Sequence, residues 1–402
     1  MIQHIEIEGF KSLEKVSLDL GALNIFVGTN ASGKTNFLEA LRVLQGIGYG
    51  YSVEEIFNGK PKGANSEVWE GVRGGSTFAS FVGAETNTVQ FRVRSSLPSG
   101  GDPVSYAISV SAKDGLVNSE DLSAGDRVIY RLAPGESAIE GTNHFPGEQE
   151  NPRVTIDSSR PVLGQGWAES RDVRFDDMDD METVEAFRKQ ISDVQVLDPF
   201  PAVQRDYSLA STANRMGDHA ENFAALIKTI LKGGAKNSAY VSWLKELTPA
   251  ELDTVEILSG AAGDWLFALR KNGVNHPAPV LSDGTLRFAA IAAAFFQPSL
   301  PCTLILEEIE NGLHPTRLRL LVELLKSQAG KGIAQVMATS HSPYAISWLM
   351  EEDYRTVFLC TKNDETGATS ITPFSEVPRL MELARKQPIA DLFAEGWLES
   401  AI

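Results

Sequence analysis

The first 45 residues place apolar side chains at two different periods. IEIEGF (5–10) and VSLDL (16–20) have an apolar residue at every second position, as half-buried strands do. ALNIFVG (22–28) is a short apolar run that ends in glycine, and from Lys34 to Leu44 the apolar residues recur at helical spacing. The pattern therefore predicts strands up to residue 27, then a glycine-rich loop and a helix.

Residues 75–157 consist of short segments that are rich in β-branched and aromatic residues and are separated by Gly, Pro, Asp and Asn. This pattern is typical of an antiparallel meander. The predicted strands are STFASFV (76–82), TVQFRVRS (88–95), VSYAISVS (104–111), RVIYRLA (127–133) and RVTID (153–157).

From residue 176 an acidic start is followed by helical spacing, an order that the helix dipole favours. The predicted helices are VEAFRKQI (184–191), HAENFAALIKTIL (219–231) and AYVSWLKEL (239–247). The last two carry a modest basic cluster, which consists of Lys228, Lys232, Lys236 and Lys245.

Residues 252–402 alternate between strand-like and helix-like segments. The predicted strands are TVEIL (254–258), WLFALR (265–270), TLILEE (303–308), QVMATS (335–340) and TVFLC (356–360). The predicted helices are TLRFAAIAAAFF (285–296), PTRLRLLVELLKSQ (315–328), PYAISWLM (343–350) and two more near the C-terminus. Such alternation favours a mainly parallel, doubly wound sheet, and hence an α/β fold.

Composition narrows the class of protein. The 402 residues are 43% hydrophobic and 22% charged, which is ordinary for a globular protein, and no apolar run is long enough for a transmembrane helix. A net charge of −17 disfavours a non-specific DNA coat, so any DNA contact is expected to be local, with the Lys228–Lys245 helices as first candidates. Two cysteines without partner spacing suggest a reducing cytoplasm.

Gly28 to Thr35 (GTNASGKT) matches G-x-x-x-x-G-K-[S/T] in full and falls between the predicted strand and helix. The glycines allow backbone N–H groups and the helix N-terminus to face phosphate oxygens. In this chemistry Lys34 supplies charge to the β- and γ-phosphates, and the Thr35 hydroxyl binds Mg²⁺. The remaining alternative is a chance match.

Two carboxylates end the apolar strand TLIL. The first, Glu307, is expected to hold Mg²⁺, and the second, Glu308, to act as general base toward the attacking water. A carboxylate pair at a strand end is by itself weak evidence for a nucleotide site. It becomes stronger evidence because the same chain also carries the phosphate-loop motif.

Two further motifs lie near strand or helix ends. LSDGTLR (281–287) precedes a helix, where Ser282 and Gly284 could help to form an anion site, although a simply capped helix explains it as well. His341 follows the strand QVMATS and could reach a γ-phosphate or orient water, whereas a lone histidine is often structural.

The order of these motifs resembles that of the ATP-binding-cassette (ABC) ATPases, and within them the SMC/RecF/OLD-like branch, including predicted ATPases of anti-phage defence. The resemblance is carried by residues 1–45 and 280–350, with LSDGTLR before the carboxylates and His341 after them. It implies an ABC-ATPase head with a mainly parallel core sheet. The expected divisions are an N-terminal lobe (1–175), a helical insert (176–250) and a C-terminal lobe (251–402).

The resemblance also implies roles for individual residues. Glu307 stands where the superfamily more usually has Asp, Glu308 is the catalytic base, His341 is the switch histidine, and His314 occupies the position of a D-loop Asp. The nucleotide-binding residues that it implies are Lys11, Ser12, Asn30, Ala31, Ser32, Gly33, Lys34, Thr35, Asn36, Ser282 and Gly284, with Thr35 and Glu307 as the Mg²⁺ ligands.

The function that the resemblance implies is that of a cytoplasmic, ATP-hydrolysing protein that dimerises around ATP. It would act in DNA maintenance or anti-phage defence with a separate effector protein, such as a nuclease, and without a membrane. The alternative is the nucleotide-binding subunit of an ABC transporter. The sequence disfavours that alternative, because LSDGT and EEIE replace the transporter's LSGGQ and the proline after its glutamate.

Overall fold

The computed structural model describes residues 1–60, 69–84, 86–98, 100–141, 153–165, 178–247 and 251–397. Its contacts divide the chain into two compact units that interleave along the sequence. Unit 1 comprises Met1–Gly21, Gly28–Val194 and Leu359–Thr372, and unit 2 comprises Ala22–Val27, Gln195–Phe358 and Pro373–Ile402. The expected boundary at residues 175 and 176 lies outside the described residues, and the division into three segments stays a prediction.

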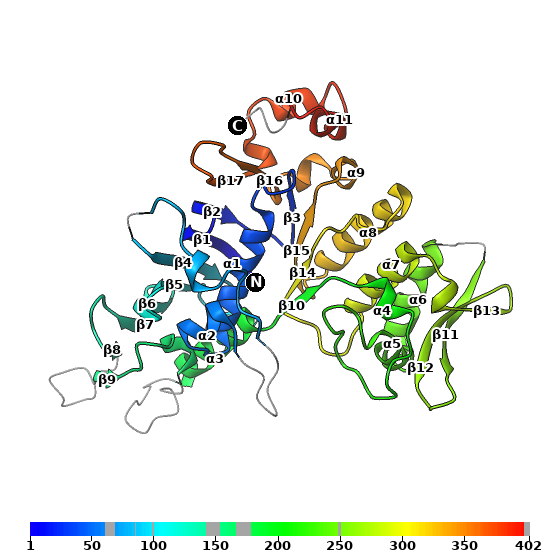
Figure 1. The fold of residues 1–402 in the computed structure, drawn as a ribbon, viewed down its shortest axis with the longest axis horizontal. Helices are drawn as coiled ribbons and strands as arrows, with labels where there is room; N and C mark the ends of the chain where they lie inside the picture. Colours follow the sequence, from blue (N-terminus) through cyan, green and yellow to red (C-terminus); the bar gives the residue numbers. More distant parts are fainter. Residues whose placement is uncertain are drawn as a thin grey trace. The chain divides into compact units, whose positions relative to one another are not determined.

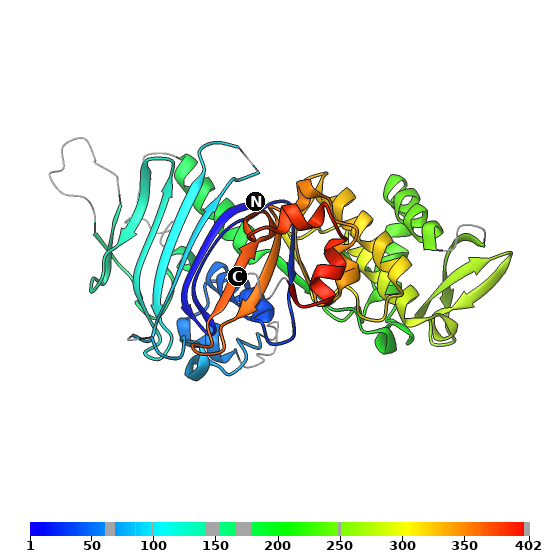
Figure 2. The same cartoon turned by 90° about the horizontal axis from the view of Figure 1, so that it is seen from above.

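The larger sheet has eight strands in the order β2-β1-β4-β5-β6-β7-β8-β9, and all neighbouring strands pair antiparallel (Figures 1 and 2). The strands are β1 (Ile2–Phe10), β2 (Leu13–Asp19), β4 (Thr88–Ser95), β5 (Val104–Ser111), β6 (Leu116–Ala124), β7 (Arg127–Leu132), β8 (Ala138–Gly141) and β9 (Arg153–Thr155). This sheet confirms the antiparallel prediction for the middle of the chain.

Three details of that sheet differ from the prediction, and one of them is the short strand β8, which was not predicted. The expected strand at 76–82 is a short 3₁₀ helix, η1 (Ser76–Phe78), followed by a single bridge from Ser80 to Phe10. The polar segment β6 was not predicted as a strand, yet it pairs with β5 and β7. It can enter the sheet because its buried carboxylate, Glu120, finds hydrogen-bond donors inside the fold.

Helices of unit 1 cover the apolar side of this sheet. The helix α1 (Lys34–Gly48) packs against α3 (Met178–Ser192), and Phe187 of α3 meets Tyr106 of β5 with ring centroids 5.3 Å apart. The short helix α2 (Val53–Asn58) begins with a capping box between Ser52 and Glu55. The structure thus agrees with the predicted strand, loop and helix at the start of the chain.

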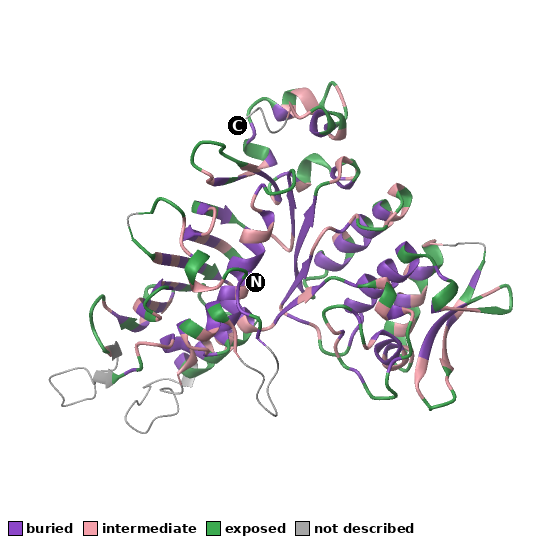
Figure 3. Ribbon diagram, in the orientation of Figure 1, coloured by how far each residue is buried: buried purple, intermediate pink, exposed green. Residues whose placement is uncertain are grey.

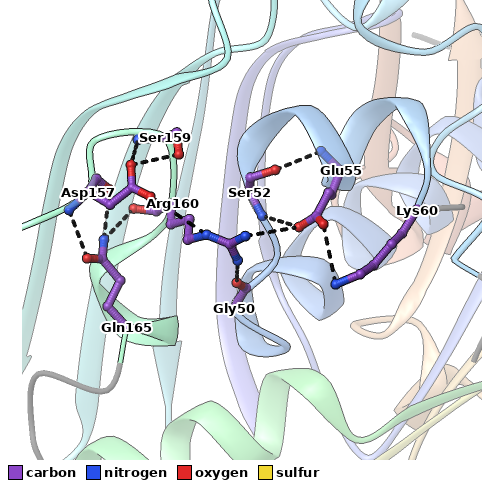
Figure 4. A network of polar contacts seen from close by, with 8 residues as sticks. All are labelled: Gly50, Ser52, Glu55, Lys60, Asp157, Ser159, Arg160 and Gln165. Carbon is purple, nitrogen blue, oxygen red and sulfur yellow. Dashed lines mark hydrogen bonds and ion pairs between the residues drawn. The ribbon is translucent and has the colours of Figure 1, made fainter. Parts of the chain in front are cut away.

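Polar contacts join α2 to the segment around η2 (Val162–Gly164). Figure 4 shows Glu55 between two cations, with Lys60 at 3.3 Å and Arg160 at 3.7 Å. Arg160 also donates to the Gly50 carbonyl (2.8 Å), and Asp157 accepts from Ser159. These bonds order the chain where it leaves α1.

The second sheet has the order β10-β14-β15-β3-β16-β17. Its strands are β3 (Leu23–Val27), β10 (Val194–Leu197), β14 (Thr303–Leu306), β15 (Gln335–Ser340), β16 (Val357–Lys362) and β17 (Thr369–Pro373). The pairs β14–β15 and β15–β3 are parallel, and β14 and β15 are buried along their whole length (Figure 3). Continuous apolar runs such as TLIL suit strands that are covered on both faces.

The predicted strands TVEIL and WLFALR do not join that sheet. They form a separate antiparallel sheet, β11 (Leu252–Ser259), β12 (Trp265–Lys271) and β13 (Val274–Pro277). The prediction of one doubly wound sheet for residues 252–402 was therefore wrong for these two strands. The cause is a close hairpin connection, which favours antiparallel pairing over a crossover.

The helices of unit 2 are mostly those that the sequence predicts, although the shorter ones differ at their ends. They are α4 (Pro201–Gln204), α5 (Phe223–Leu231), α6 (Ala235–Leu247), α7 (Asp283–Ala294), α8 (Pro315–Ala329), α9 (Pro343–Ile346), α10 (Leu380–Ala384) and α11 (Ile389–Ala394). Within the described ranges, no helix combines the length and the apolar character needed to cross a membrane.

Candidate nucleotide site

The glycine loop is shaped by left-handed backbone and by close contacts. Gly33 lies directly before α1 with φ +99°, and Ala31 has φ +66°. A Cβ atom on Gly33 would stand 2.0 Å from the Thr369 hydroxyl, and one on Gly28 would stand 2.3 Å from the Cys360 carbonyl oxygen. Both glycines are therefore required by the fold of unit 1 itself.

Lys34 folds back into its own loop. Its ammonium donates to the carbonyl oxygens of Gly28 (2.6 Å) and Thr29 (2.7 Å), and the residue is only 8% exposed. A buried cation needs such partners, because burial without them costs several kcal/mol. The loop thus holds one positive charge inside its curve. Of its other residues Asn30 and Ala31 are exposed, Ser32 is buried, and Thr35 is half-buried.

The predicted residues Ser12 and Asn36 lie together, next to Gly33. The Ser12 hydroxyl accepts from the Asn36 amide (2.6 Å) and lies 2.7 Å from the Thr369 hydroxyl. Thr369 thus links all three positions, although it was not predicted from the sequence. No sequence motif marks it, because it lies more than 330 residues further along the chain.

Lys11 has a different set of partners. It adopts φ +50°, and its ammonium pairs with the buried carboxylate of Glu39 in α1 and donates to the Arg73 carbonyl (2.9 Å). Glu39 was also missed by the sequence analysis, since a glutamate within a helix is usually solvated. In the structure Lys11 is therefore neutralised by α1.

In unit 2 three parallel strands end at nearly the same level. Val27 of β3 is paired with Ser340 of β15, and Leu306 of β14 with Ala338. In the sequence these strands are followed at once by the glycine loop, by His341 and by Glu307. Ligands of open α/β sheets bind at the carboxyl ends of parallel strands, which is where these motifs begin.

Glu308 has a strained backbone that several groups hold. Its φ is +47°, a left-handed conformation that costs a non-glycine residue roughly 1–2 kcal/mol. Its N–H donates to the Thr339 hydroxyl (2.9 Å), and its carboxylate accepts from Asn311 (2.5 Å). Strain of this kind gathers at functional sites, where the surroundings impose it. Glu307 beside it is half-buried.

Arg287 reaches the same segment from α7. It is 5% exposed, and it donates to the carbonyl oxygens of Glu307 (2.9 Å) and Glu308 (3.3 Å). Its other terminal nitrogen bonds the Asp198 carboxylate (2.9 Å) and the Pro199 carbonyl (3.0 Å). This arginine lies within the motif LSDGTLR, but the sequence pattern predicts no role for it.

Ser282 caps α7, as the capped-helix interpretation predicts. Its hydroxyl accepts from the Thr285 N–H (3.3 Å) and from Arg317 of α8 (2.9 Å), and the residue is exposed. A Cβ on Gly284 would lie 2.6 Å from the Gly312 carbonyl oxygen. In the structure, then, the close approach that Gly284 allows is to the chain itself.

His341 is held by a carboxylate that the sequence analysis missed. Its Nδ1 lies 2.8 Å from Oε1 of Glu310, and its backbone N–H donates to the same oxygen (2.6 Å). The other histidine of interest, His314, caps α8, and its Nδ1 lies 2.7 Å from the Thr316 hydroxyl.

Two of the four lysines in the basic cluster that was predicted to contact DNA make contacts with other residues of the chain. The Lys228 ammonium lies 3.7 Å from the ring centroid of Trp265, and that of Lys236 donates to the Gln297 carbonyl (3.0 Å). Lys232 and Lys245 are exposed. Two lysines are a small contribution to phosphate binding, so a DNA contact here would be weak.

A buried parallel strand, a glycine loop with its lysine and a following helix together define a P-loop protein. The chain belongs to the family described as "AAA domain, putative AbiEii toxin, Type IV TA system", whose model matches residues 23–347. The family model therefore places the chain among the AAA domains.

Among curated proteins, the chain is 23% identical over 397 residues to an "ATP/GTP phosphatase" of Helicobacter pylori, covering 94% of this chain and 96% of the relative. Among solved structures, it resembles an SMC head bound to the C-terminal winged-helix domain of ScpA, with 14% identity, a TM-score of 0.52, and 92% and 96% of the two chains covered.

It also resembles the SMC head with an extended coiled coil bound to the C-terminal domain of ScpA, derived from Pyrococcus furiosus. There the identity is 13%, the TM-score 0.53, and the coverage 96% and 99% of the two chains. At such identities these structures speak for the fold alone. Neither the family, nor the phosphatase relative, nor the two SMC heads support the transporter alternative.

Proposed function

We propose that the chain is a Mg²⁺-dependent, cytoplasmic ATPase that closes into a homodimer around ATP and acts through a separate effector protein. The observation that supports it best is the common edge of β3, β15 and β14, since a predicted nucleotide motif follows each strand directly. The family and the named phosphatase relative support nucleotide hydrolysis as its chemistry.

In this proposal Lys34 exchanges its loop carbonyls for phosphate oxygens, and Ser12 and Asn36 help to place the nucleotide. Of the remaining predicted residues, Asn30, Ala31, Ser32 and Gly33 belong to the same loop, whereas Lys11 lies beside Glu39 and Arg73. Lys11 can join only by leaving Glu39, so its contribution is the least direct of the set.

The hydroxyl of Thr35 and the carboxylate of Glu307 suit Mg²⁺, which prefers oxygen ligands and needs few from the protein when phosphates and waters supply the rest. Among the described residues there is no cluster of three His, Cys, Asp or Glu side chains that could hold a metal by itself. The bound Mg²⁺ would neutralise charge on the phosphates. Glu308 accepts a proton from the attacking water, and His341 faces the γ-phosphate.

The proposed dimer would form at the start of α7, where Ser282 is exposed and Gly284 is buried. Ser282 and Gly284 there would complete the γ-phosphate site of a second copy, and a ligand that contacts both copies favours the closed pair. The partner is proposed by analogy, because the named SMC heads bind ScpA domains and the family description names a toxin system. DNA maintenance or anti-phage defence would then be carried out by that effector, such as a nuclease.

The test compares wild type, Lys34→Ala and Glu308→Gln in ATP and GTP turnover, with and without Mg²⁺, and in sedimentation with ATP. Wild type should hydrolyse nucleotide only with Mg²⁺, and Lys34→Ala should bind none. Glu308→Gln should lose about 100- to 1000-fold in kcat and accumulate as an ATP-bound dimer. Glu323→Gln, which neutralises an exposed glutamate of α8, is the matched control. Normal hydrolysis by Glu308→Gln would rule out the general base, and a monomer in ATP would rule out the dimer.

A further inference from the structure

Glu310 binds both the backbone and the ring of His341 through a single oxygen. Its Oε1 accepts the His341 backbone N–H at 2.6 Å and lies 2.8 Å from Nδ1 of the ring. The Glu310 side chain is 10% exposed, whereas that of His341 is 39% exposed. Two anchors on one oxygen leave the imidazole ring a single favoured orientation.

This contact also decides which ring nitrogen carries the proton. An ionised carboxylate can only accept hydrogen bonds, so Nδ1 must be the donor. Nε2 is then the nitrogen that remains for a ligand, and within the described residues it has no hydrogen-bond partner. A partner on one ring nitrogen that sets the role of the other is common at catalytic histidines.

The pair is fastened to the sheet edge by short contacts. The Ile309 N–H donates to the Thr339 carbonyl (3.0 Å), and the Glu308 N–H donates to the Thr339 hydroxyl (2.9 Å). Since Glu310 follows these two residues and His341 lies two positions beyond Thr339, the segment 308–310 and the end of β15 hold each other in register. The distance between Glu310 and His341 is thereby built into unit 2.

Stability alone does not account for Glu310. Its second oxygen, Oε2, is buried and has no hydrogen-bond partner among the described residues. A buried carboxylate with one oxygen unpaired is costly to keep. Such a residue is expected where its paired oxygen performs a task that a neutral side chain would perform less well.

We propose that Glu310 is the positioning residue of His341: it orients the imidazole and holds it as the Nδ1–H tautomer, with Nε2 directed to the phosphate. The proposal rests on the proposed function, in which His341 faces the γ-phosphate. The contacts of the Glu310 carboxylate in the structure are to His341, so Glu310 would act on the reaction through that histidine.

The experiment uses the full chain with Glu310→Ala, Glu310→Gln, His341→Ala, the double variant Glu310→Ala/His341→Ala and the control Glu323→Gln. The ring nitrogens of the six histidines are observed by ¹⁵N NMR without nucleotide, and His341→Ala assigns the relevant signals. Steady-state kinetics with Mg²⁺ and ATP give kcat and KM for each variant.

Wild type should show the Nδ1–H form at His341, and Glu310→Ala should shift it toward the Nε2–H form. Glu310→Ala should lower kcat by about 10- to 100-fold and leave the KM for ATP within about twofold, with Glu310→Gln intermediate. The double variant should be no slower than His341→Ala, because Glu310 has nothing left to position.

Unchanged ring nitrogen signals in Glu310→Ala, or a double variant that is slower by the product of both single effects, would overturn the proposal. A fall in kcat that is matched by a rise in KM would point to general loosening of the loop and would overturn it as well. A wild-type protein without nucleotide turnover would instead refute the proposed function, while the NMR signals would still decide whether Glu310 sets the His341 tautomer.

Discussion

Two regions of the molecule bury carboxylates in opposite ways. In unit 1, Glu120 is 1% exposed and accepts four hydrogen bonds. They come from the hydroxyls of Tyr106 (3.0 Å) and Tyr130 (2.8 Å) and from the N–H groups of Val162 (2.6 Å) and Leu163 (2.9 Å). In unit 2, one oxygen of Glu310 has no partner in the described part of the chain, and Glu308 has a left-handed backbone.

We interpret the difference as that between a structural carboxylate and the carboxylates that we propose to be functional. Glu120 joins β5, β6 and β7 to η2, and both of its oxygens accept hydrogen bonds from groups of unit 1. The segment 308–310 keeps strain and an unpaired acceptor, both of which a fold selected only for stability would remove. We therefore expect Glu120 to govern unfolding, and the segment 308–310 to govern turnover.

The largest effect is expected at Glu120. Glu120→Ala leaves two buried hydroxyls and two backbone N–H groups without their acceptor, which should lower the free energy of unfolding by about 3–5 kcal/mol. Chemical denaturation measures this loss, and kcat per folded molecule should stay near the wild-type value. Glu14→Ala, on the exposed side of β2, is the control and should change stability by less than about 0.5 kcal/mol. A comparable loss in both variants would contradict the assigned role.

A smaller effect of the same carboxylate should appear with pH. Burial is the main cause that raises the pKa of Glu120 to about 7, and the four donors oppose the rise. Because the folded state binds this proton more tightly than the unfolded state, the contribution of Glu120 to stability is complete below about pH 4.5. It is lost as the pH rises through about 7, by up to about 3 kcal/mol.

The measurement is the difference in unfolding free energy between wild type and Glu120→Gln from pH 4.5 to 8. Groups that titrate alike in both proteins contribute equally to the two free energies, so their contributions cancel in the difference. Wild type should lose stability relative to the variant as the pH rises. A flat difference would mean that the hydrogen bonds fully compensate for burial.

The sequence predicted what local patterns encode. The strands β4 and β5 were predicted to the residue, and the loop before α1 is shaped by glycine conformations that its own motif specifies. It did not predict β6, because a central glutamate in a polar segment is a poor strand signal until Tyr106 and Tyr130 are in place. The sequence also did not predict the strands that β12 pairs with, because the period of apolar residues indicates a strand but not its neighbours in a sheet.

The candidate site divides in the same way. Lys34 and Glu308 could be predicted because their motifs are contiguous, although their roles stay predictions. The roles of three other residues could not be predicted, because each depends on a contact with a segment that is distant in the sequence. These residues are Glu310, Arg287 and Thr369. Among several carboxylates in ILEEIENGLHP, spacing alone does not say which one meets His341.

An intermediate effect is expected at Arg287, which supports the strained carbonyls from α7. Arg287→Lys removes the guanidinium fork, so the bonds to both the 307–308 carbonyls and Asp198 cannot be kept together. We expect kcat to fall about 10-fold and stability by about 1–3 kcal/mol. The control Asp198→Asn retains the carbonyl contacts and should change kcat by less than about twofold. Equal losses in the two variants would show that Arg287 acts through Asp198 instead.

The smallest effect tests whether the segment at Glu308 stores strain. Glu308→Gly and Glu308→Ala both remove the carboxylate and should both abolish turnover, but only glycine adopts φ +47° without steric cost. Glu308→Gly should therefore be the more stable of the two by about 1 kcal/mol, measured by denaturant unfolding. At Glu323, within α8, the same pair of substitutions should give the opposite order, because glycine weakens a helix by about 1 kcal/mol relative to alanine. If alanine were the more stable residue at both positions, the left-handed backbone at 308 would carry no strain, and the contrast with Glu120 would rest on the unpaired oxygen of Glu310 alone.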